Sequence, residues 1–185
     1  AVLLNGATYS AGEVGAAFFL DGVSARITAP PTPALDFGPG VDFTFEGWIQ
    51  AFPTPGNDFG IATIADKRLA PNTFDCVGIS FYLQDGKLGM QLSDGPLPNP
   101  AWTKFESAAP NLQDGLWHHV AASVQRSSTN GGNLYVDGVS VLVFDPTTEP
   151  GDLSTTAPLR FGNHDDQTLN CFFKGSIDEM TIYRR

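Results

Sequence analysis

The chain has 185 residues, of which 42% are hydrophobic, 11% are aromatic and only 16% are charged. This composition suits one packed domain and argues against an intrinsically disordered chain. Twenty acidic against ten basic residues give a net charge of −10, so we expect no nucleic-acid partner and no anionic membrane surface as a partner. Because no apolar run approaches the roughly 20 residues of a membrane-spanning helix, we expect no membrane insertion either.

Period-two alternation of apolar and polar residues recurs along the chain and predicts short β-strands. The segment Asp42–Gln50 is an example, because its Phe43, Phe45 and Ile49 share one face. Thr44, Glu46 and Trp48 share the other face. In chain order, the predicted strands are Val14–Leu20, Ser24–Ala29, Asp42–Gln50, Gly60–Asp66, Val77–Leu83, Lys87–Leu92, Trp117–Gln125, Asn133–Val136, Val139–Phe144, Leu159–Gly162 and Gly175–Tyr183.

Two Asp-Gly pairs, Asp85-Gly86 and Asp137-Gly138, separate consecutive predicted strands and are typical of tight β-hairpins. No segment shows a convincing helical period, and 20 Gly and 14 Pro interrupt the chain throughout. With no linker or internal repeat, residues 1–185 predict a single all-β domain, a two-sheet antiparallel jelly-roll sandwich. Long loops are expected at Pro30–Gly40, Ala65–Cys76, Asp94–Gly115, Asp145–Pro158 and Asn163–Cys171.

The two cysteines, Cys76 and Cys171, each lie in a polar loop immediately before a predicted strand. No Cys-x-x-Cys or Cys-His cluster indicates a zinc site. We therefore expect a Cys76–Cys171 disulfide, which would close a loop of about 95 residues and stabilise the fold by about 4 kcal/mol. It would also indicate an oxidising, extracellular or periplasmic setting. Two buried free thiols are the alternative.

Four segments occur in an order and spacing that resemble a laminin-G-like module of the concanavalin A-like lectin and glucanase group. They are Phe19–Gly22, Phe43–Ile49, Trp117–Ala121 and Phe172–Tyr183. The resemblance covers nearly the whole chain and implies a jelly-roll fold in a secreted or cell-surface protein. Members commonly carry an opening strand before the segment similar to Leu4–Thr8. That strand is missing here, which suggests a domain excised or processed from a larger protein and an open first sheet edge.

The resemblance also implies a structural calcium ion that ties the last strand to the early chain. Asp178 matches the carboxylate of the last strand, and Asp21 is the match in the early chain. Calcium takes six to eight hard oxygen ligands, which Asp carboxylates and backbone carbonyls supply. The alternative is that Asp21 forms a turn and Asp178 caps a neighbouring backbone amide.

The most polar segment runs from Asn163 to Asn170 and predicts a rim that binds sugar hydroxyl groups. A disulfide would fasten this segment beside the long loop that precedes Cys76. Trp102, from the loop before Gly115, could offer a flat apolar face to a sugar ring. The alternative is a solvated polar segment, with the Trp102 side chain packed on the core. The candidate ligand-binding residues are Asp66, Asn72, Trp102, Asn163, His164, Asp165, Asp166 and Asn170.

Catalysis is the least favoured interpretation. Asp42, Thr44 and Glu46 share a strand face, as acidic residues do in glycosidases of this fold, but the middle position is not a carboxylate. His118 and His119 are adjacent on a strand, so their side chains point to opposite faces of the sheet and do not readily coordinate one metal ion.

We therefore expect a non-catalytic extracellular binding module, with carbohydrate or a cell-surface glycan as partner. A structural or adhesive domain that binds protein or self-associates through an open sheet edge is the alternative.

Overall fold

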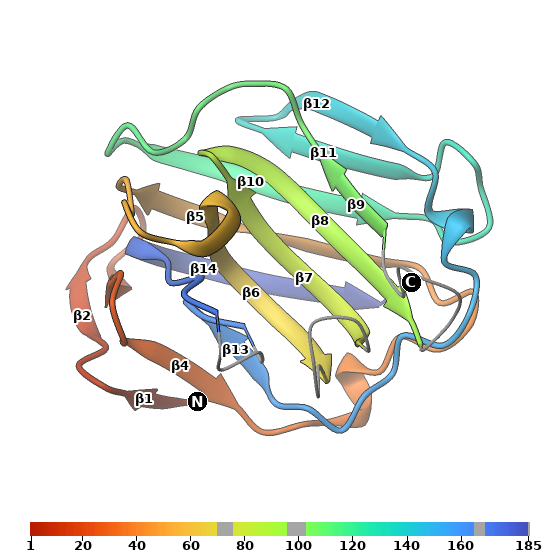
Figure 1. Cartoon of the computed structure of the whole chain (residues 1–185), viewed down its shortest axis with the longest axis horizontal. Helices are drawn as coiled ribbons and strands as arrows, with labels where there is room; N and C mark the ends of the chain where they lie inside the picture. Colours follow the sequence, from red (N-terminus) through yellow and green to blue (C-terminus); the bar gives the residue numbers. More distant parts are fainter. Residues whose placement is uncertain (70–75, 96–102, 165–168, 185) are drawn as a thin grey trace.

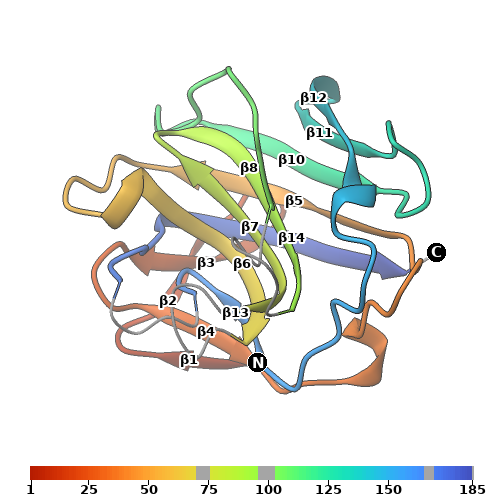
Figure 2. The same ribbon diagram turned by 45° about the vertical axis from the view of Figure 1, so that its right-hand side comes forward.

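The computed structural model describes residues 1–69, 76–95, 103–164 and 169–184. Two antiparallel sheets of seven strands each lie face to face, with the hydrophobic core between them (Figures 1 and 2). This confirms the predicted two-sheet jelly-roll sandwich. The described residues contain no helix that is long and apolar enough to cross a membrane.

The spatial order of the strands differs from their order along the chain in both sheets. Sheet A contains, from edge to edge, β1 (Val2–Leu4), β4 (Arg26–Ala29), β13 (Leu159–Phe161), β6 (Ile61–Leu69), β7 (Val77–Gln84), β8 (Lys87–Asp94) and β9 (Thr103–Glu106). Sheet B contains, from edge to edge, β12 (Val139–Phe144), β11 (Gly132–Val136), β10 (Trp117–Val124), β5 (Phe43–Ala51), β14 (Lys174–Arg184), β3 (Ala16–Asp21) and β2 (Thr8–Ala11). Three short 3-10 turns are η1 (Pro33–Leu35), η2 (Asp58–Gly60) and η3 (Pro146–Thr148).

Strand β5 lies at the centre of sheet B and shows why the alternating sequence folds this way. Phe43, Phe45 and Ile49 are buried in the core, as the period of two predicted. Phe37, from the connection between β4 and β5, packs its ring 4.8 Å from Phe43 and 6.1 Å from Phe45. This aromatic cluster therefore anchors a long loop as well as the two sheets.

The two Asp-Gly hairpins are confirmed. Asp85 and Gly86 have φ values of 49° and 79°, and Asp137 and Gly138 have φ values of 50° and 79°. Two consecutive positive φ angles define the type I′ turn, whose twist matches the flanking strands. These turns fix the registers of β7 with β8 and of β11 with β12.

Three strands were not predicted: β1, β2 and β9. Each has only three or four residues and lies at a sheet edge, so one side of its ladder is unpaired. Such short segments hold too few alternating residues for a period to be recognised. Strand β1 pairs with β4 and supplies the edge of sheet A, where the sequence predicted an open edge.

The predicted Cys76–Cys171 disulfide is wrong, because both cysteines are buried thiols. The Cys171 carbonyl accepts a hydrogen bond from Thr63 N of β6 (3.1 Å), whereas Val77, next to Cys76, pairs with Leu69. Thr63 and Leu69 are six residues apart, about 20 Å along a strand. A disulfide needs Cα atoms within about 7 Å of each other. The alternative of two buried thiols is therefore the correct one.

We expect alkylation of the unreduced, denatured protein to add two groups by intact-mass spectrometry, with or without prior reduction. In the native protein, Cys76 should react slowly, because burial raises the pKa of its thiol and leaves little thiolate near neutral pH. Alkylation that requires reduction would contradict the two separate thiols.

Candidate ligand-binding groove

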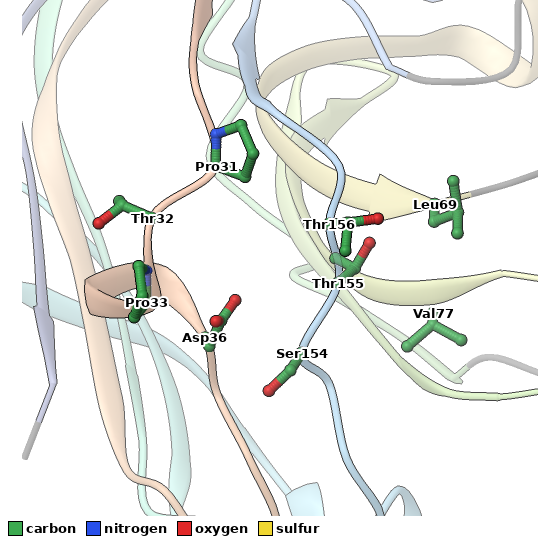
Figure 3. A pocket seen from close by; sticks show the side chains of 9 residues that line it. All are labelled: Pro31, Thr32, Pro33, Asp36, Leu69, Val77, Ser154, Thr155 and Thr156. Carbon is green, nitrogen blue, oxygen red and sulfur yellow. The ribbon is translucent and has the colours of Figure 1, made fainter.

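One end of the sandwich carries an open groove between two connections that are far apart in the sequence. The β4–β5 connection, with η1, and the β12–β13 connection run side by side there, next to the end of β6 (Figures 1 and 2). The groove has a volume of about 480 Å³, inside the range of roughly 300–1,000 Å³ that is usual for ligand pockets. Its described lining residues are Pro31, Thr32, Pro33 and Asp36 (the 31–36 segment), Ser154, Thr155 and Thr156 (the 154–156 segment), and Leu69 and Val77 at the ends of β6 and β7 (Figure 3).

Lys67 of β6 ties the two segments together. Its Nζ donates a hydrogen bond to the Thr155 carbonyl (2.6 Å) and lies 3.4 Å from Asp36 Oδ1. The Lys67 side chain is only 2% exposed, so these acceptors are needed to offset the desolvation of its ammonium group. In addition, Leu153 N donates to the Phe37 carbonyl (3.0 Å). The relative position of the two segments is therefore fixed by the fold rather than by a ligand.

The 31–36 segment is shaped by its own capping residues. Thr32 is the N-cap of η1, and its hydroxyl oxygen accepts a hydrogen bond from Ala34 N (3.4 Å). Pro33 follows at the first position of the turn, where its fixed φ is favourable and no N–H is required. Arg184, near the end of β14, donates from Nη1 to the Pro33 carbonyl (2.9 Å).

The 154–156 segment is held by hydrogen bonds at both ends. Asp152 Oδ1 accepts from Ser154 N (2.8 Å), and the Thr155 hydroxyl oxygen accepts from Ala157 N (3.1 Å). The Thr155 hydroxyl thereby keeps its own proton available for donation.

A buried cluster around Arg126 fixes the chain that leads into this segment. Arg126 Nη2 donates to the carbonyls of Glu149 and of Gly151. Asp94 Oδ2 accepts from Gly151 N (2.7 Å), and Glu149 Oε1 accepts from the Thr103 hydroxyl (2.6 Å). Burial, together with the nearby Asp94 carboxylate, raises the pKa of Glu149. This cluster joins β8, β9 and the turn after β10 to the connection that forms one side of the groove.

The groove combines two kinds of surface. Pro31, Pro33, Leu69 and Val77 present apolar C–H groups, whereas the serine and threonine side chains present hydroxyl groups. Asp36 adds one carboxylate. The described lining contains no aromatic ring. Such a surface can contact a ligand that has both C–H faces and many hydroxyl groups.

Asp66, the first of the predicted ligand-binding residues, lies next to Lys67 but on the opposite face of β6. It pairs in register with Ser80 and Arg160, on the side of sheet A that points away from the core. Its carboxylate is fully buried and accepts from Arg68 Nε (2.6 Å), with Arg160 Nη1 at 3.9 Å. Asp66 is thus engaged in an internal ion-pair network and does not line the groove.

The other predicted residues that the structure describes do not line the groove either. Asn163 and His164 are buried just after β13, where Asn163 Oδ1 accepts from His164 N (2.7 Å). Asn170 exchanges hydrogen bonds with Asp58, before the start of β6 and at the opposite end of that strand from Leu69. The remaining predicted ligand residues, Asn72, Trp102, Asp165 and Asp166, lie outside the described residues.

Asp21 organises the turn after β3. Its Oδ1 accepts hydrogen bonds from the backbone N–H groups of Val23, Ser24 and Ala25, each at 2.9 Å. Partial burial raises the pKa of Asp21, but the three N–H donors lower it more, so the pKa lies below its ordinary value.

Asp178 has a similar role elsewhere and does not share a site with Asp21. Its Oδ2 accepts from Val14 N (2.8 Å), and its Oδ1 accepts from Glu179 N (2.9 Å). Asp21 pairs with Lys174, four residues before Asp178, which is about 13 Å along β14. The two carboxylates therefore do not fit one shared calcium ion. The described residues hold no group of three or more His, Cys, Asp or Glu side chains arranged for a metal.

The residues considered for catalysis also lie away from the groove. Glu46 Oε1 accepts from the Tyr183 hydroxyl (2.9 Å), and His119 packs edge-on against Trp48 at 5.2 Å. His118 lies between two carboxylates, 2.8 Å from Asp137 and 3.3 Å from Asp114.

The sequence did not single out any groove residue. The 31–36 and 154–156 segments fall inside the predicted long loops Pro30–Gly40 and Asp145–Pro158, which are both rich in proline and hydroxyl side chains. Lys67, which ties the two segments, gave no signal either, because it falls in the predicted loop Ala65–Cys76, where a lysine is ordinarily exposed.

A family model described as the concanavalin A-like lectin/glucanases superfamily matches residues 20–185. The chain belongs to this superfamily. No curated protein matches the chain.

Several solved structures have a fold similar to that of this concanavalin A-like domain. The binding domain of Paraclostridial mosquitocidal protein 1 aligns with a TM-score of 0.75 and 18% identity, over 100% of this chain and 44% of that chain. The ligand binding domain of botulinum neurotoxin serotype D, in complex with N-acetylneuraminic acid, aligns with a TM-score of 0.67 and 13% identity over 98% and 42%. Domain 4 of an extracellular arabinanase from Geobacillus stearothermophilus, in complex with arabinotriose, aligns with a TM-score of 0.59 and 21% identity over 97% and 76%.

The domain thus spans less than half the length of both toxin chains. At these identities the likeness shows the fold alone.

We expect Asp21→Ala to lower the free energy of unfolding of this concanavalin A-like domain by about 1 kcal/mol at pH 7, measured by urea denaturation. Because the folded pKa of Asp21 is depressed, its contribution is present above the unfolded pKa of about 3.9 and is lost as pH falls through the folded pKa. The difference in free energy of unfolding between the unmodified domain and Asp21→Ala should therefore decrease in acid. Asp21→Asn keeps an acceptor and is the control.

The same titrations test the calcium prediction. An ion held by Asp21 would make the loss in Asp21→Ala larger in calcium chloride than in EDTA, whereas the three amide contacts alone predict equal losses.

We also expect His118→Gln to cost about 0.5 kcal/mol at pH 5.5 and much less at pH 9. Partial burial lowers the pKa of His118, but hydrogen bonds to Asp137 and Asp114 raise it more. A raised folded pKa means that the stabilisation is complete below the unfolded pKa of about 6.5 and disappears as pH rises through the folded value. Thermal melts of both proteins across this range measure the difference, and a pH-independent difference would contradict the ion pairs.

Proposed function

We propose that the domain is a non-catalytic binding module that recognises carbohydrate in the groove between the 31–36 and 154–156 segments. The observation that carries this proposal is the composition of a pre-formed groove, in which apolar C–H groups and hydroxyl groups line the same 480 Å³ space. A binding site that is already shaped in the free protein loses little conformational entropy when the ligand binds.

The chemistry of a saccharide matches this lining. A sugar ring has faces of C–H groups and edges of hydroxyl groups that both donate and accept hydrogen bonds. Pro31, Pro33, Leu69 and Val77 can contact the C–H faces, whereas the hydroxyl groups of the 154–156 segment can pair with the edges. Without an aromatic platform among the described lining residues, the hydrogen bonds carry most of the selectivity.

The solved relatives support a binding role. One is a toxin binding domain, one is a toxin ligand binding domain in complex with N-acetylneuraminic acid, and one is an arabinanase domain in complex with arabinotriose. Their low identity carries no residue over to this chain. They support the proposal only because this sandwich presents saccharide ligands in other proteins.

The proposal of a non-catalytic role rests on the carboxylates. Glycoside hydrolysis uses a pair of carboxyl groups, about 5 to 9.5 Å apart, on either side of the scissile bond. The described groove lining contains a single carboxylate, Asp36, and so no pair of carboxyl groups. Glu46 lies on the outer face of sheet B and binds the Tyr183 hydroxyl.

We further propose a secreted or cell-surface location, where glycans are accessible. The cysteines no longer support this location, because they do not form the disulfide on which that inference rested. The proposal therefore depends on the ligand.

A glycan array followed by titration calorimetry with the strongest array ligand tests the function. We expect Thr156→Val, which removes an exposed hydroxyl group from the groove, to weaken binding about tenfold, the loss of roughly one hydrogen bond. Thr8→Val removes an exposed hydroxyl group from the edge strand β2 and is the matched control, so it should bind as the unmodified protein does.

Equal losses in both variants, or binding that survives in Thr156→Val, would place the site elsewhere. A silent array together with concentration-dependent sedimentation would favour the adhesive alternative, in which the domain binds protein or itself.

A further inference from the structure

The groove has an uneven distribution of charge. Among its described lining residues only Asp36 is ionisable, and its side chain is 41% exposed. Asp36 Oδ1 faces Lys67, whereas no described residue forms a hydrogen bond to Oδ2. The carboxylate is therefore available to a ligand as a hydrogen-bond acceptor and as a negative charge.

The nearby cations do not offer a ligand an equivalent positive charge. Lys67 is 2% exposed, does not line the groove, and directs its ammonium group to Asp36 and the Thr155 carbonyl. Arg184 binds the Pro33 carbonyl from the side of β14 and is not a lining residue either. The whole domain adds a net charge of −10 to this local field.

These charges have opposite effects on neutral and acidic sugars. A neutral sugar can donate a hydroxyl hydrogen bond to Asp36, and a hydrogen bond to a charged acceptor is stronger than one to a neutral acceptor. A sugar carboxylate or sulfate near Asp36 Oδ2 would instead be repelled, because it would lie nearer to that oxygen than to the Lys67 ammonium group on Oδ1. Two unit charges about 4 Å apart in water repel with an energy that corresponds to about a fivefold loss of affinity, and the charge of Lys67 makes the loss smaller. The accessible part of the described lining holds no cation to compensate.

We propose, on the basis of the carbohydrate-binding function above, that the groove selects uncharged saccharides over acidic ones and that Asp36 is the residue that makes the selection. The carboxylate accepts a hydrogen bond from a neutral sugar hydroxyl group and repels an anionic substituent at the same place. Lys67 acts as a positioning residue, because it holds Asp36 against the 154–156 segment without presenting its own charge to the ligand.

The experiment uses pairs of saccharides that differ in charge. Trigalacturonic acid and its fully methyl-esterified form differ only at the carboxyl groups, lactose and 3′-sialyllactose differ by one acidic sugar, and N-acetyllactosamine is compared with its 6-sulfate. Affinities are measured by calorimetry or by NMR titration at low and at high salt. We expect the neutral member of each bound pair to bind more tightly, by up to about fivefold, and the difference to shrink as salt screens the repulsion.

Asp36→Asn separates charge from shape. An asparagine retains an acceptor for Lys67 and for a sugar hydroxyl group but carries no charge, so acidic members should gain affinity and the preference should disappear. Glu13→Gln removes the same charge from the exposed turn between β2 and β3. This turn binds Asp178 through Val14, about 20 Å along β14 from Arg184, so the preference should remain in Glu13→Gln.

The outcomes distinguish the two proposals. If no neutral or acidic saccharide binds, the carbohydrate function itself is overturned and the selection with it. If acidic members bind as tightly as neutral ones, or more tightly, the function stands and the selection by Asp36 is wrong. If Arg184→Gln then abolishes the binding of acidic members, Arg184 rather than Asp36 sets the charge preference. An unchanged preference in Asp36→Asn also overturns the assignment.

Discussion

The ammonium group of Lys67 holds together the end of the molecule that carries the groove. A lysine side chain that is almost completely removed from water loses its hydration, and only nearby acceptors can replace it. Those acceptors come from two connections that are more than one hundred residues apart in the chain, through Asp36 and the Thr155 carbonyl. The strand that carries Lys67 is paired on both sides, so the position of the lysine is fixed by the sheet. The two loops therefore adopt the conformations that place their acceptors next to it. The groove lies where these loops meet.

Around this constraint, the sandwich provides rigidity in layers. The aromatic rings of Phe37, Phe43 and Phe45 hold the base of one loop against the core. The buried guanidinium group of Arg126 holds the start of the other loop through two backbone carbonyls. The lining residues of such a groove can thus vary without loss of the loop backbones, because these are anchored by residues that are not among its described lining residues.

The fold was predictable from the sequence, whereas the site was not, and the reason is physical. Alternation along β5 and the Asp137-Gly138 turn depend on neighbouring residues, so a single sequence reveals them. The groove depends on which loops meet at the end of β6. These loops are far apart in the sequence, so no pattern among neighbouring residues reveals the groove. Asp66 and Lys67 illustrate the difference. Both are charged residues in one strand, and only the pairing with Ser80 and Arg160 shows that Asp66 points away from the loops. The disulfide prediction failed for the same reason. Cys76 and Cys171 both lie in polar loops, but these loops are at opposite ends of β6.

The alternation of charge along β6 has a consequence for folding. A β-bulge between Thr63 and Ala65 shifts the pairing of this strand with β7, and Lys67 follows two residues later. If the strand threaded one position out of step, the Lys67 ammonium group would turn to the exterior. Asp66 and Arg68, which share the other face of β6, would both enter the sandwich, and Asp66 would lose Arg160. Such an arrangement would remove Lys67 and Asp66 from the acceptors and donors that compensate their burial in the native structure. The charges of Asp66, Lys67 and Arg68 therefore favour the native register of β6 over a one-residue shift. This preference does not depend on what the groove binds.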